Sequence, residues 1–208
     1  MNRIVDSIFD YYNMLYAIAH FLRDKMPWIW DMVDMLNSSL FSLRYGNRLK
    51  NFKFKTVLDG YKIVAIREVA TDKLVEFFAH QPEEAYKFFR PHGFDKKSLK
   101  KLQRNRAFLA YVLVENTTGI IAGYCFNRSF FLGKGFRGRM VDIDFRGKGL
   151  GTIMNCLLNE VGFGIGLRLF ETVNRDNIAS YKSALSASKV SVIEELEDGD
   201  LYLEILKD

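Results

Sequence analysis

The chain has 208 residues, of which 49% are apolar and 26% are charged, and its formal net charge is +5. This length suits one domain of ordinary size plus an extension, and the apolar content excludes a largely disordered protein. The modest positive charge suits an anionic cofactor, an acidic substrate or a membrane surface, and does not by itself indicate nucleic-acid binding.

The two cysteines, Cys125 and Cys156, lie in apolar strand and helix contexts. We expect buried thiols in a reducing compartment, and three scattered histidines without ligand spacing predict no metal site. Asp6 and Asp10 interrupt the N-terminal apolar run, and no uncharged apolar run reaches about 18 residues. The sequence therefore predicts a cytoplasmic protein without a secretory signal or a spanning helix.

Residues 1–50 differ in residue pattern from the rest of the chain. Apolar residues recur there at helical spacing and are followed by Trp28 and Trp30. One interpretation is a helical pair that packs on the main domain or in a homodimer. The other is an interfacial helix on a membrane, with both tryptophans at headgroup level. Basic residues that would meet anionic lipid in that case are Arg23, Lys25, Arg44, Arg48 and Lys50.

Beyond residue 60 the pattern alternates between strands and helices. Strands are predicted at 61–69, 108–116, 120–131, 137–144 and 167–173, with a closing hairpin at about 190–206. Helices are predicted at 71–80, 83–89, about 95–103, after residue 151, and from Asn174 to about Ala187. A turn with Pro91 and Gly93 is expected to expose His92.

The stretch from Val141 to Gly151 predicts a strand, a basic glycine turn and then a helix capped by Thr152. Glycines at 147, 149 and 151 let a ligand approach the backbone closely. Free N–H groups at a helix N-terminus attract anions, and Arg146 and Lys148 add two cations. The turn is therefore a candidate cradle for a phosphate or diphosphate.

The spacing R-x-x-G-x-G, from Arg146 through Gly149 to Gly151, resembles the coenzyme A pyrophosphate loop of the GNAT superfamily of N-acetyltransferases. The predicted element order over residues 61–206 and the motif N-x-x-N-x-A-S at 174–180 match the same family. The resemblance implies an α/β (α+β) fold with a mixed, mostly antiparallel central sheet of about seven strands flanked by helices. It implies a domain at 61–208, with residues 1–60 as an N-terminal helical extension.

The resemblance also implies acetyl-CoA as cofactor and assigns residues to it. Backbone N–H groups of the cradle would hold the pyrophosphate, and a backbone N–H of the preceding strand would polarise the thioester carbonyl. Asn174 and Asn177 would also face the cofactor. The cofactor-binding residues so implied are Val141, Asp142, Ile143, Arg146, Gly147, Lys148, Gly149, Leu150, Gly151, Thr152, Asn174 and Asn177.

Three residues are candidates for the base that deprotonates the amine. His92 lies in the region that shapes the acceptor pocket in this fold, and its ordinary pKa near 6.5 suits a base. Asp142 lies on the cofactor strand, where a solvent-facing position without a catalytic role is equally expected. Glu171 lies on the strand beyond the cradle.

The sequence departs from the family at the proton donor. Alignment on Asn177, Ala179 and Ser180 places Ala184 where many members carry a tyrosine. Tyr181, one turn earlier, is the nearest candidate for the general acid.

The leading hypothesis is an acetyl-CoA-dependent N-acetyltransferase acting on a small amine such as an amino sugar or amino acid. Short strings at 90–92 and 42–46 look like pieces of proteins from bacterial surface-polysaccharide loci. The alternatives are a coenzyme A-binding or regulatory module without turnover and a membrane-peripheral assembly protein that uses residues 1–50.

Overall fold

The computed structural model describes residues 27–56, 58–196 and 199–207. The predicted helix before Pro27, with Arg23 and Lys25, lies outside the described residues. Contacts divide the chain into two units, Met1–Asn37 and Ser38–Asp208. The second unit therefore includes the residues between 38 and 60 as well as the predicted domain.

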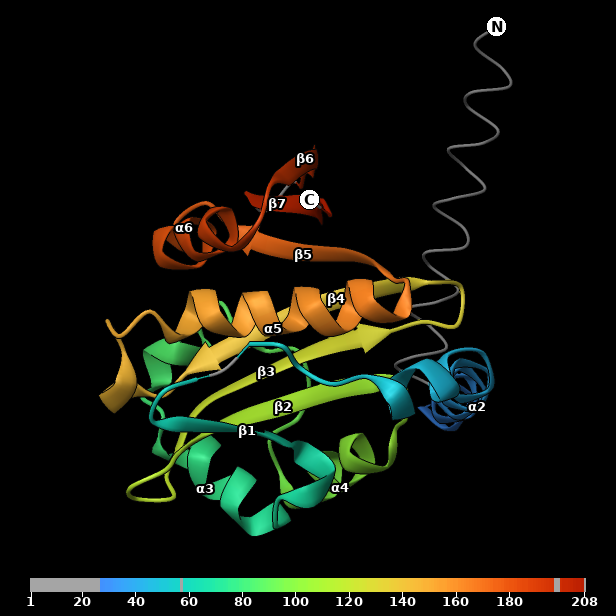
Figure 1. The fold of residues 1–208 in the computed structure, drawn as a ribbon, viewed down its shortest axis with the longest axis horizontal. Helices are drawn as coiled ribbons and strands as arrows, with labels where there is room; N and C mark the ends of the chain where they lie inside the picture. The colour runs from blue at the N-terminus through green and yellow to red at the C-terminus, as the bar shows by residue number, and fades with distance from the viewer. Residues whose placement is uncertain (1–26, 57, 197–198, 208) are drawn as a thin grey trace, which may run out of the picture. The chain divides into compact units, whose positions relative to one another are not determined.

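The second unit is built on one seven-stranded sheet in the order β1-β2-β3-β4-β5-β7-β6 (Figure 1). All neighbouring strands are antiparallel except β4 and β5, which are parallel. The predicted mixed, mostly antiparallel sheet is confirmed. The strands are β1 (Tyr61–Ala65), β2 (Phe108–Glu115), β3 (Ile121–Ser129), β4 (Lys134–Val141), β5 (Arg168–Asn174), β6 (Val190–Glu195) and β7 (Asp200–Ile205).

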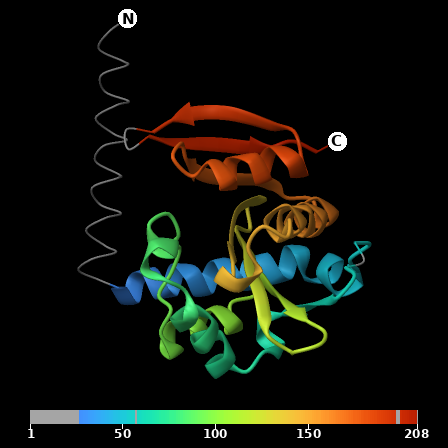
Figure 2. The ribbon, with the colours of Figure 1, turned by 90° about the vertical axis from the view of Figure 1, so that its left-hand side faces the viewer.

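Strands β4 and β5 pair over a short distance only. Their ladder runs from Lys134 opposite Arg168 to Phe136 opposite Phe170. Strand β4 continues to Val141 and β5 to Asn174 without further pairing between them. The two edges therefore diverge, and the elements after α5 form a group of their own at the top of Figure 2.

Helices cover both faces of the first four strands. Val112 of β2 belongs to a core with α3 (Thr71–His80) and α4 (Lys96–Arg104), whereas the next residue, Leu113, belongs to a core with α5 (Leu150–Ile165). Because successive side chains of a strand point to opposite faces, a sheet covered on both faces needs apolar residues at nearly every position. This explains why β2 is an almost uninterrupted apolar run and why β3 carries no charged residue before Arg128.

Short 3-10 helices and capped helix ends connect these elements. Two short 3-10 helices, η1 (Ile66–Glu68) and η2 (Glu83–Tyr86), flank α3, so the helix predicted at 83–89 is a single short turn. The helix α4 is capped by Asp95, whose carboxylate accepts hydrogen bonds from the N–H groups of Lys97 and Ser98. The helix α6 (Ile178–Ala187) follows β5 and lies against α5.

The second half of α2 (Pro27–Asn51) packs on the sheet. From Ser38 onward the helix buries Phe41 and Tyr45 in a core with Leu109 and with Val161 and Ile165 of α5. Arg44 Nη1 donates to the carbonyl of Phe131 at 2.9 Å, and Arg48 Nη1 to that of Ile165 at 2.7 Å. These two arginines therefore bind the domain, as the packing interpretation expects. Trp28 and Trp30, in the first half of the helix, are exposed.

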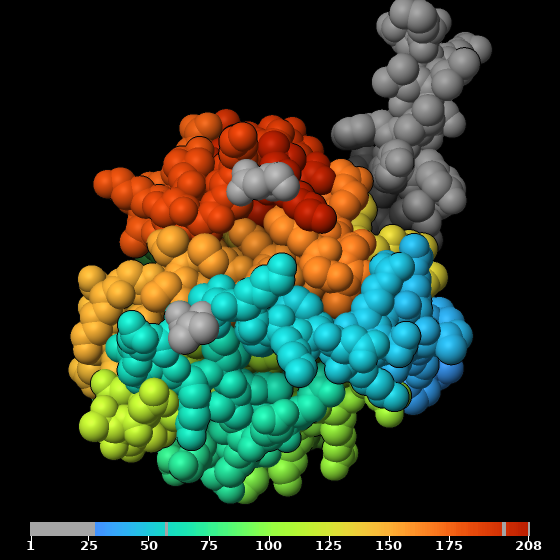
Figure 3. Space-filling model, in the orientation of Figure 1, coloured from blue at the N-terminus to red at the C-terminus, as the bar shows by residue number. Residues whose placement is uncertain are grey.

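The segment after α2 extends this contact along α5. The ring of Phe52 lies against Gly164, and Thr56 Oγ1 donates to Glu160 at 3.0 Å. In Figure 3 the cyan segment that follows α2 borders the orange surface of α5. Among the described residues, no helix is long and apolar enough to cross a membrane.

Candidate functional site

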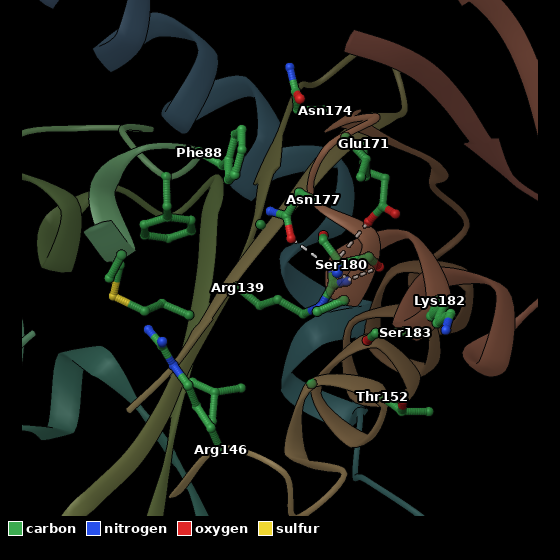
Figure 4. Close-up of a pocket in the computed structure, with 18 of the residues that line it drawn as sticks. Phe88, Arg139, Arg146, Thr152, Glu171, Asn174, Asn177, Ser180, Lys182 and Ser183 are labelled. Carbon is green, nitrogen blue, oxygen red and sulfur yellow. Dashed lines mark hydrogen bonds and ion pairs between the residues drawn. The ribbon is translucent and has the colours of Figure 1, made fainter. Parts of the chain in front are cut away.

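A cavity of about 1210 Å³ lies where β4 and β5 diverge. One wall comes from the turn between Arg146 and Thr152 and from α6, and another from the segment 84–90. Figure 4 shows Phe88 and Arg146 on one side of the cavity and Ser180 and Ser183 on the other. The divergence of the strands thus opens a space that the glycine turn borders.

The glycine turn leads directly into α5. Gly147 and Gly149 adopt left-handed conformations, with φ of 76° and 75°. Gly149 is the N-cap of α5, so the helix begins at Leu150 and the predicted cap at Thr152 is wrong. Instead, the N–H of Thr152 donates to the carbonyl of Gly149 at 3.1 Å.

This turn fits a diphosphate group. A Cβ atom on Gly147 or Gly149 would meet nothing within 4 Å, so the space beside both backbones is open. The first N–H groups of a helix have no partner within the helix and attract anions together with the helix dipole. No acidic residue lies in the first turn of α5, and Arg146 lines the cavity. Backbone and charge therefore both favour a bound anion.

Not all predicted cofactor residues line the cavity. Those that do are Val141, Arg146, Gly147, Gly149, Leu150, Gly151, Thr152, Asn174 and Asn177. Lys148 does not, and its Nζ lies 4.6 Å from the centre of the Phe145 ring. Leu150 is buried and also belongs to the core beneath α5.

The predicted cofactor strand is shorter than expected. It ends at Val141, and Ile143–Phe145 form a 3-10 helix, η3. The N–H of Asp142 donates to Ala122 on β3, and that of Ile143 donates to Gln81 Oε1. Since successive N–H groups of a strand point to opposite sides, the N–H of Val141 points away from β3, toward the gap beside β5. The structure thus leaves Val141, rather than Asp142 or Ile143, with an N–H directed at the cavity.

Asp142 is buried, so the expected solvent-facing position is wrong. Its Oδ2 accepts a hydrogen bond from Gln81 Nε2 at 2.6 Å, and its Oδ1 accepts one from the N–H of Asp144 at 3.0 Å. The carboxylate caps η3 and does not line the cavity. Tertiary contact with Gln81, which a strand pattern does not reveal, explains the difference.

Asp142 also belongs to the one group of potential metal ligands in the described part of the chain. One ligand atom each from His80, Asp142 and Asp144 lies within 4.8 Å of the others. His80 Nε2 and Asp144 Oδ2 are 2.9 Å apart, and this pairing raises the pKa of His80 above its ordinary value. Hydrogen bonds within the chain account for the arrangement without an ion.

His92 is packed among aromatic rings instead of being exposed by its turn. Its Nδ1 lies 2.9 Å from the carbonyl of Gly93, and its Nε2 lies 3.0 Å from the hydroxyl of Tyr124. Burial lowers the pKa of His92 to about 4. The ring is therefore neutral at pH 7, donates from Nδ1 and accepts at Nε2, and it does not line the cavity.

Substitution of His92 with glutamine should reduce the dependence of stability on pH. The unfolded chain binds the proton near pH 6.5 and the folded chain only near pH 4, so the free energy of unfolding should fall as pH decreases between these values. Urea unfolding of the wild type and of His92→Gln at several pH values measures this. His80→Gln is the control and should change the pH dependence in the opposite direction. The pKa of His80 is raised in the folded chain, so its contribution to the free energy of unfolding is lost as pH rises. Equal pH dependence in wild type and His92→Gln would contradict the assignment.

Glu171 lines the cavity within an ion cluster that the sequence did not predict. Its Oε2 accepts from Arg137 Nε at 2.6 Å and from Arg139 Nη1 at 3.3 Å. Arg137 Nη1 also donates to Asn159 Oδ1 at 2.5 Å. All three charged side chains are almost completely buried and line the cavity. Arginines at alternate positions of β4 were a signal in the sequence, because a strand places both on one face.

The start of α6 closes the cavity. Asn177 Oδ1 accepts from the N–H of Ser180 and caps α6, and Asn174 bonds to Asp200 through its Nδ2 at 2.7 Å. Tyr181 does not line the cavity, and Ala184 is fully buried. The predicted acid candidate is thus not at the site, and the position of the family tyrosine carries no polar group.

The chain is similar to known proteins in its structure but not in its sequence. No family model matches the sequence, and no curated protein matches it. Among solved structures, it is similar to the ribosomal-protein-S5-alanine acetyltransferase of Vibrio fischeri, with 13% identity and a TM-score of 0.59 over 73% of this chain and 95% of that one. It is also similar to the GNAT domain of PAT from S. lividans, with 14% identity and a TM-score of 0.60 over 70% and 89% of the two chains.

A third similar structure is yncA of Salmonella typhimurium, described as a putative acetyltransferase with its cofactor acetyl-CoA. Its identity is 20% and its TM-score 0.53, over 71% of this chain and 94% of that one. At these identities the likeness concerns the fold. The chain has the fold of the GNAT acetyltransferases.

Proposed function

We propose that this protein is an acetyl-CoA-dependent N-acetyltransferase that acts on the amine of a small acceptor. The observation that carries the proposal is the open glycine turn at the start of α5, which borders a cavity between diverging strands. The GNAT fold supports it, and a structure of similar fold is described with acetyl-CoA. An amino sugar or amino acid is the acceptor class we propose, with surface-polysaccharide synthesis as a setting.

In this mechanism the backbone N–H groups between Gly147 and Gly151 would hold the pyrophosphate, since the N–H of Thr152 already bonds to Gly149, and Arg146 would add a cation. The N–H of Val141 would donate to the thioester carbonyl and so polarise it for attack by the amine. Asn174 at the end of β5 and Asn177 at the start of α6 line the cavity and would lie beside the cofactor. The segment 84–90, with the exposed ring of Phe88, forms the wall that the acceptor meets.

Among the three predicted bases, Glu171 alone lines the cavity, and its Oε1 has no partner in the described chain. Its Oε2 is already occupied by ion pairs with two guanidinium groups, those of Arg137 and Arg139. We therefore assign no general base, and the amine enters in its neutral form.

Thermal unfolding with graded acetyl-CoA tests the proposal, with ATP and NAD as controls. Ligand at about 100 times its dissociation constant adds about 2.7 kcal/mol, which for this chain length raises the midpoint by about 5–10 °C. We expect a saturable rise with acetyl-CoA alone, followed by release of free thiol with members of an amine panel. An equal rise with ATP, or none with acetyl-CoA, would refute it.

A coenzyme A-binding module without turnover is the second candidate. The observation that favours it is the fully buried Ala184 at the position of the family tyrosine. Such a module would show the same thermal shift with acetyl-CoA but no thiol release with any amine. The amine panel therefore separates the two candidates.

A further inference from the structure

A buried cluster of three charges lies where the two strands diverge. Arg137 and Arg139 extend from one face of β4, and Glu171 extends from β5 between them. Strand pairing places this face toward α5, since Arg139 lies opposite Cys125, a member of the core beneath that helix. With two guanidinium groups and one carboxylate, the cluster carries a net charge of +1.

This net charge is unusual for its surroundings. The side chains of Arg137, Arg139 and Glu171 are 0%, 8% and 2% exposed. Buried charges are costly unless they are paired, and Glu171 is the only carboxylate that forms an ion pair with either arginine in the described chain. Arg137 Nη2 also has no hydrogen-bond partner there. The cluster therefore has one positive charge that no carboxylate balances, and it lines a cavity in which an anionic group can bind.

Arg139 extends toward α6. Its Nη2 donates to the carbonyl of Ser180 at 2.8 Å and to Ser180 Oγ at 3.1 Å, as Figure 4 shows. Ser180 lies one helical turn before Ala184. A fixed cation thus lies beside the helix on which the family places its proton donor, and Ala184 itself offers no proton.

We propose that Arg139 is a catalytic cation that stabilises the leaving thiolate of coenzyme A, with Glu171 moderating its charge. The inference rests on the function proposed above. A guanidinium keeps its proton in proteins, so it acts by charge and hydrogen bonding instead of by proton donation.

The step balances without a general acid. The amine nitrogen forms a bond to the thioester carbonyl carbon, and the amine proton passes to solvent through the cavity. When the tetrahedral intermediate collapses, the carbon–sulfur bond breaks and its electron pair goes to sulfur. The resulting thiolate pairs with Arg139 and takes a proton from water after release.

The thiol pKa of bound coenzyme A measures this directly. Titration of the thiolate absorbance in the ultraviolet, with coenzyme A bound to the wild type, should give a pKa about 1 to 3 units below that of free coenzyme A. Arg139→Gln removes one positive charge from the cluster and should raise the bound pKa, whereas Glu171→Gln should lower it further. Arg139→Lys keeps the charge and should preserve most of the depression.

Opposite shifts in these two variants distinguish electrostatic stabilisation from a structural role, which would move both in the same direction. The double variant Arg139→Gln/Glu171→Gln restores the net charge of +1 but lacks the cation that pairs with the thiolate, so its bound pKa should lie above that of Glu171→Gln. If one of the single variants does not fold, the double variant still provides a test, because its cluster keeps the net charge of the wild type. In turnover, Arg139→Gln should lower kcat about 10²-fold, while the thermal shift with acetyl-CoA stays.

Two results would overturn the inference. One is a bound thiol pKa equal to that of free coenzyme A in the wild type. The other is a shift of equal sign in Arg139→Gln and Glu171→Gln. Failure of coenzyme A to bind the wild type would instead refute the proposed function, so the two failures are distinguishable.

Discussion

Gly149→Trp should weaken acetyl-CoA binding at least about 100-fold, which corresponds to about 2.7 kcal/mol. Gly149 caps α5 in a left-handed conformation, and the position of its missing Cβ faces open space. An indole there would occupy the space beside the N–H groups that we propose bind the pyrophosphate. Isothermal titration with acetyl-CoA measures the loss.

Gly119→Trp is the matched control. Gly119 has a φ of 72°, close to the 75° of Gly149, and a Cβ there would also meet nothing within 4 Å. It lies in the turn between β2 and β3 and does not line the cavity. Both variants carry backbone strain of about 1–2 kcal/mol, so a difference in affinity reports the site alone. Full affinity in Gly149→Trp would remove the glycine turn from the cofactor site.

Glu171→Leu should lower the free energy of unfolding by about 3–5 kcal/mol. The substitution leaves the guanidinium groups of Arg137 and Arg139 buried without a carboxylate, and their desolvation is then not offset. Urea unfolding measures the change.

Glu204→Leu on the neighbouring strand β7 is the control for this effect. Glu204 pairs with Arg168 at 2.8 Å, but the arginine side chain is 64% exposed. A solvated pair of this kind contributes less than about 1 kcal/mol. If both substitutions cost the same small amount, the buried cluster would not depend on its carboxylate, and the charge balance inferred for Arg139 would lose its basis.

The sequence predicted those features that local patterns encode. The glycine turn before α5 depends on residues close together in the chain, and so does the turn at Gly119, where the left-handed glycine ends the connection between two apolar strands. The strand run of β2 is likewise a local property. Such patterns were sufficient to predict most strands and the position of the glycine turn, whereas the arrangement of the strands in one sheet came from the resemblance to the GNAT superfamily.

Features that depend on contacts between distant residues were missed. The exposure of His92 could not be judged from its Pro-Gly turn, because Tyr124 and the surrounding aromatic rings come from other elements. The cluster joins Arg137 to Glu171, 34 positions later in the chain, across strands that no longer pair at that point. Thr152 was predicted as a cap from its residue type, whereas the left-handed backbone of Gly149 begins the helix earlier.

The short parallel ladder also affects how this sheet can open. Three residue pairs join β4 to β5, whereas seven join β3 to β4. Proteins unfold locally in cooperative units of unequal free energy, and such units separate where few hydrogen bonds cross. Strands β5, β7 and β6 are continuous in sequence after α5 and remain joined to one another when that ladder breaks. We therefore expect the C-terminal fifth of the chain, from β5 onward, to open as one cooperative unit. A molecule bound between β4 and β5 would stabilise that unit before it stabilised the rest of the fold.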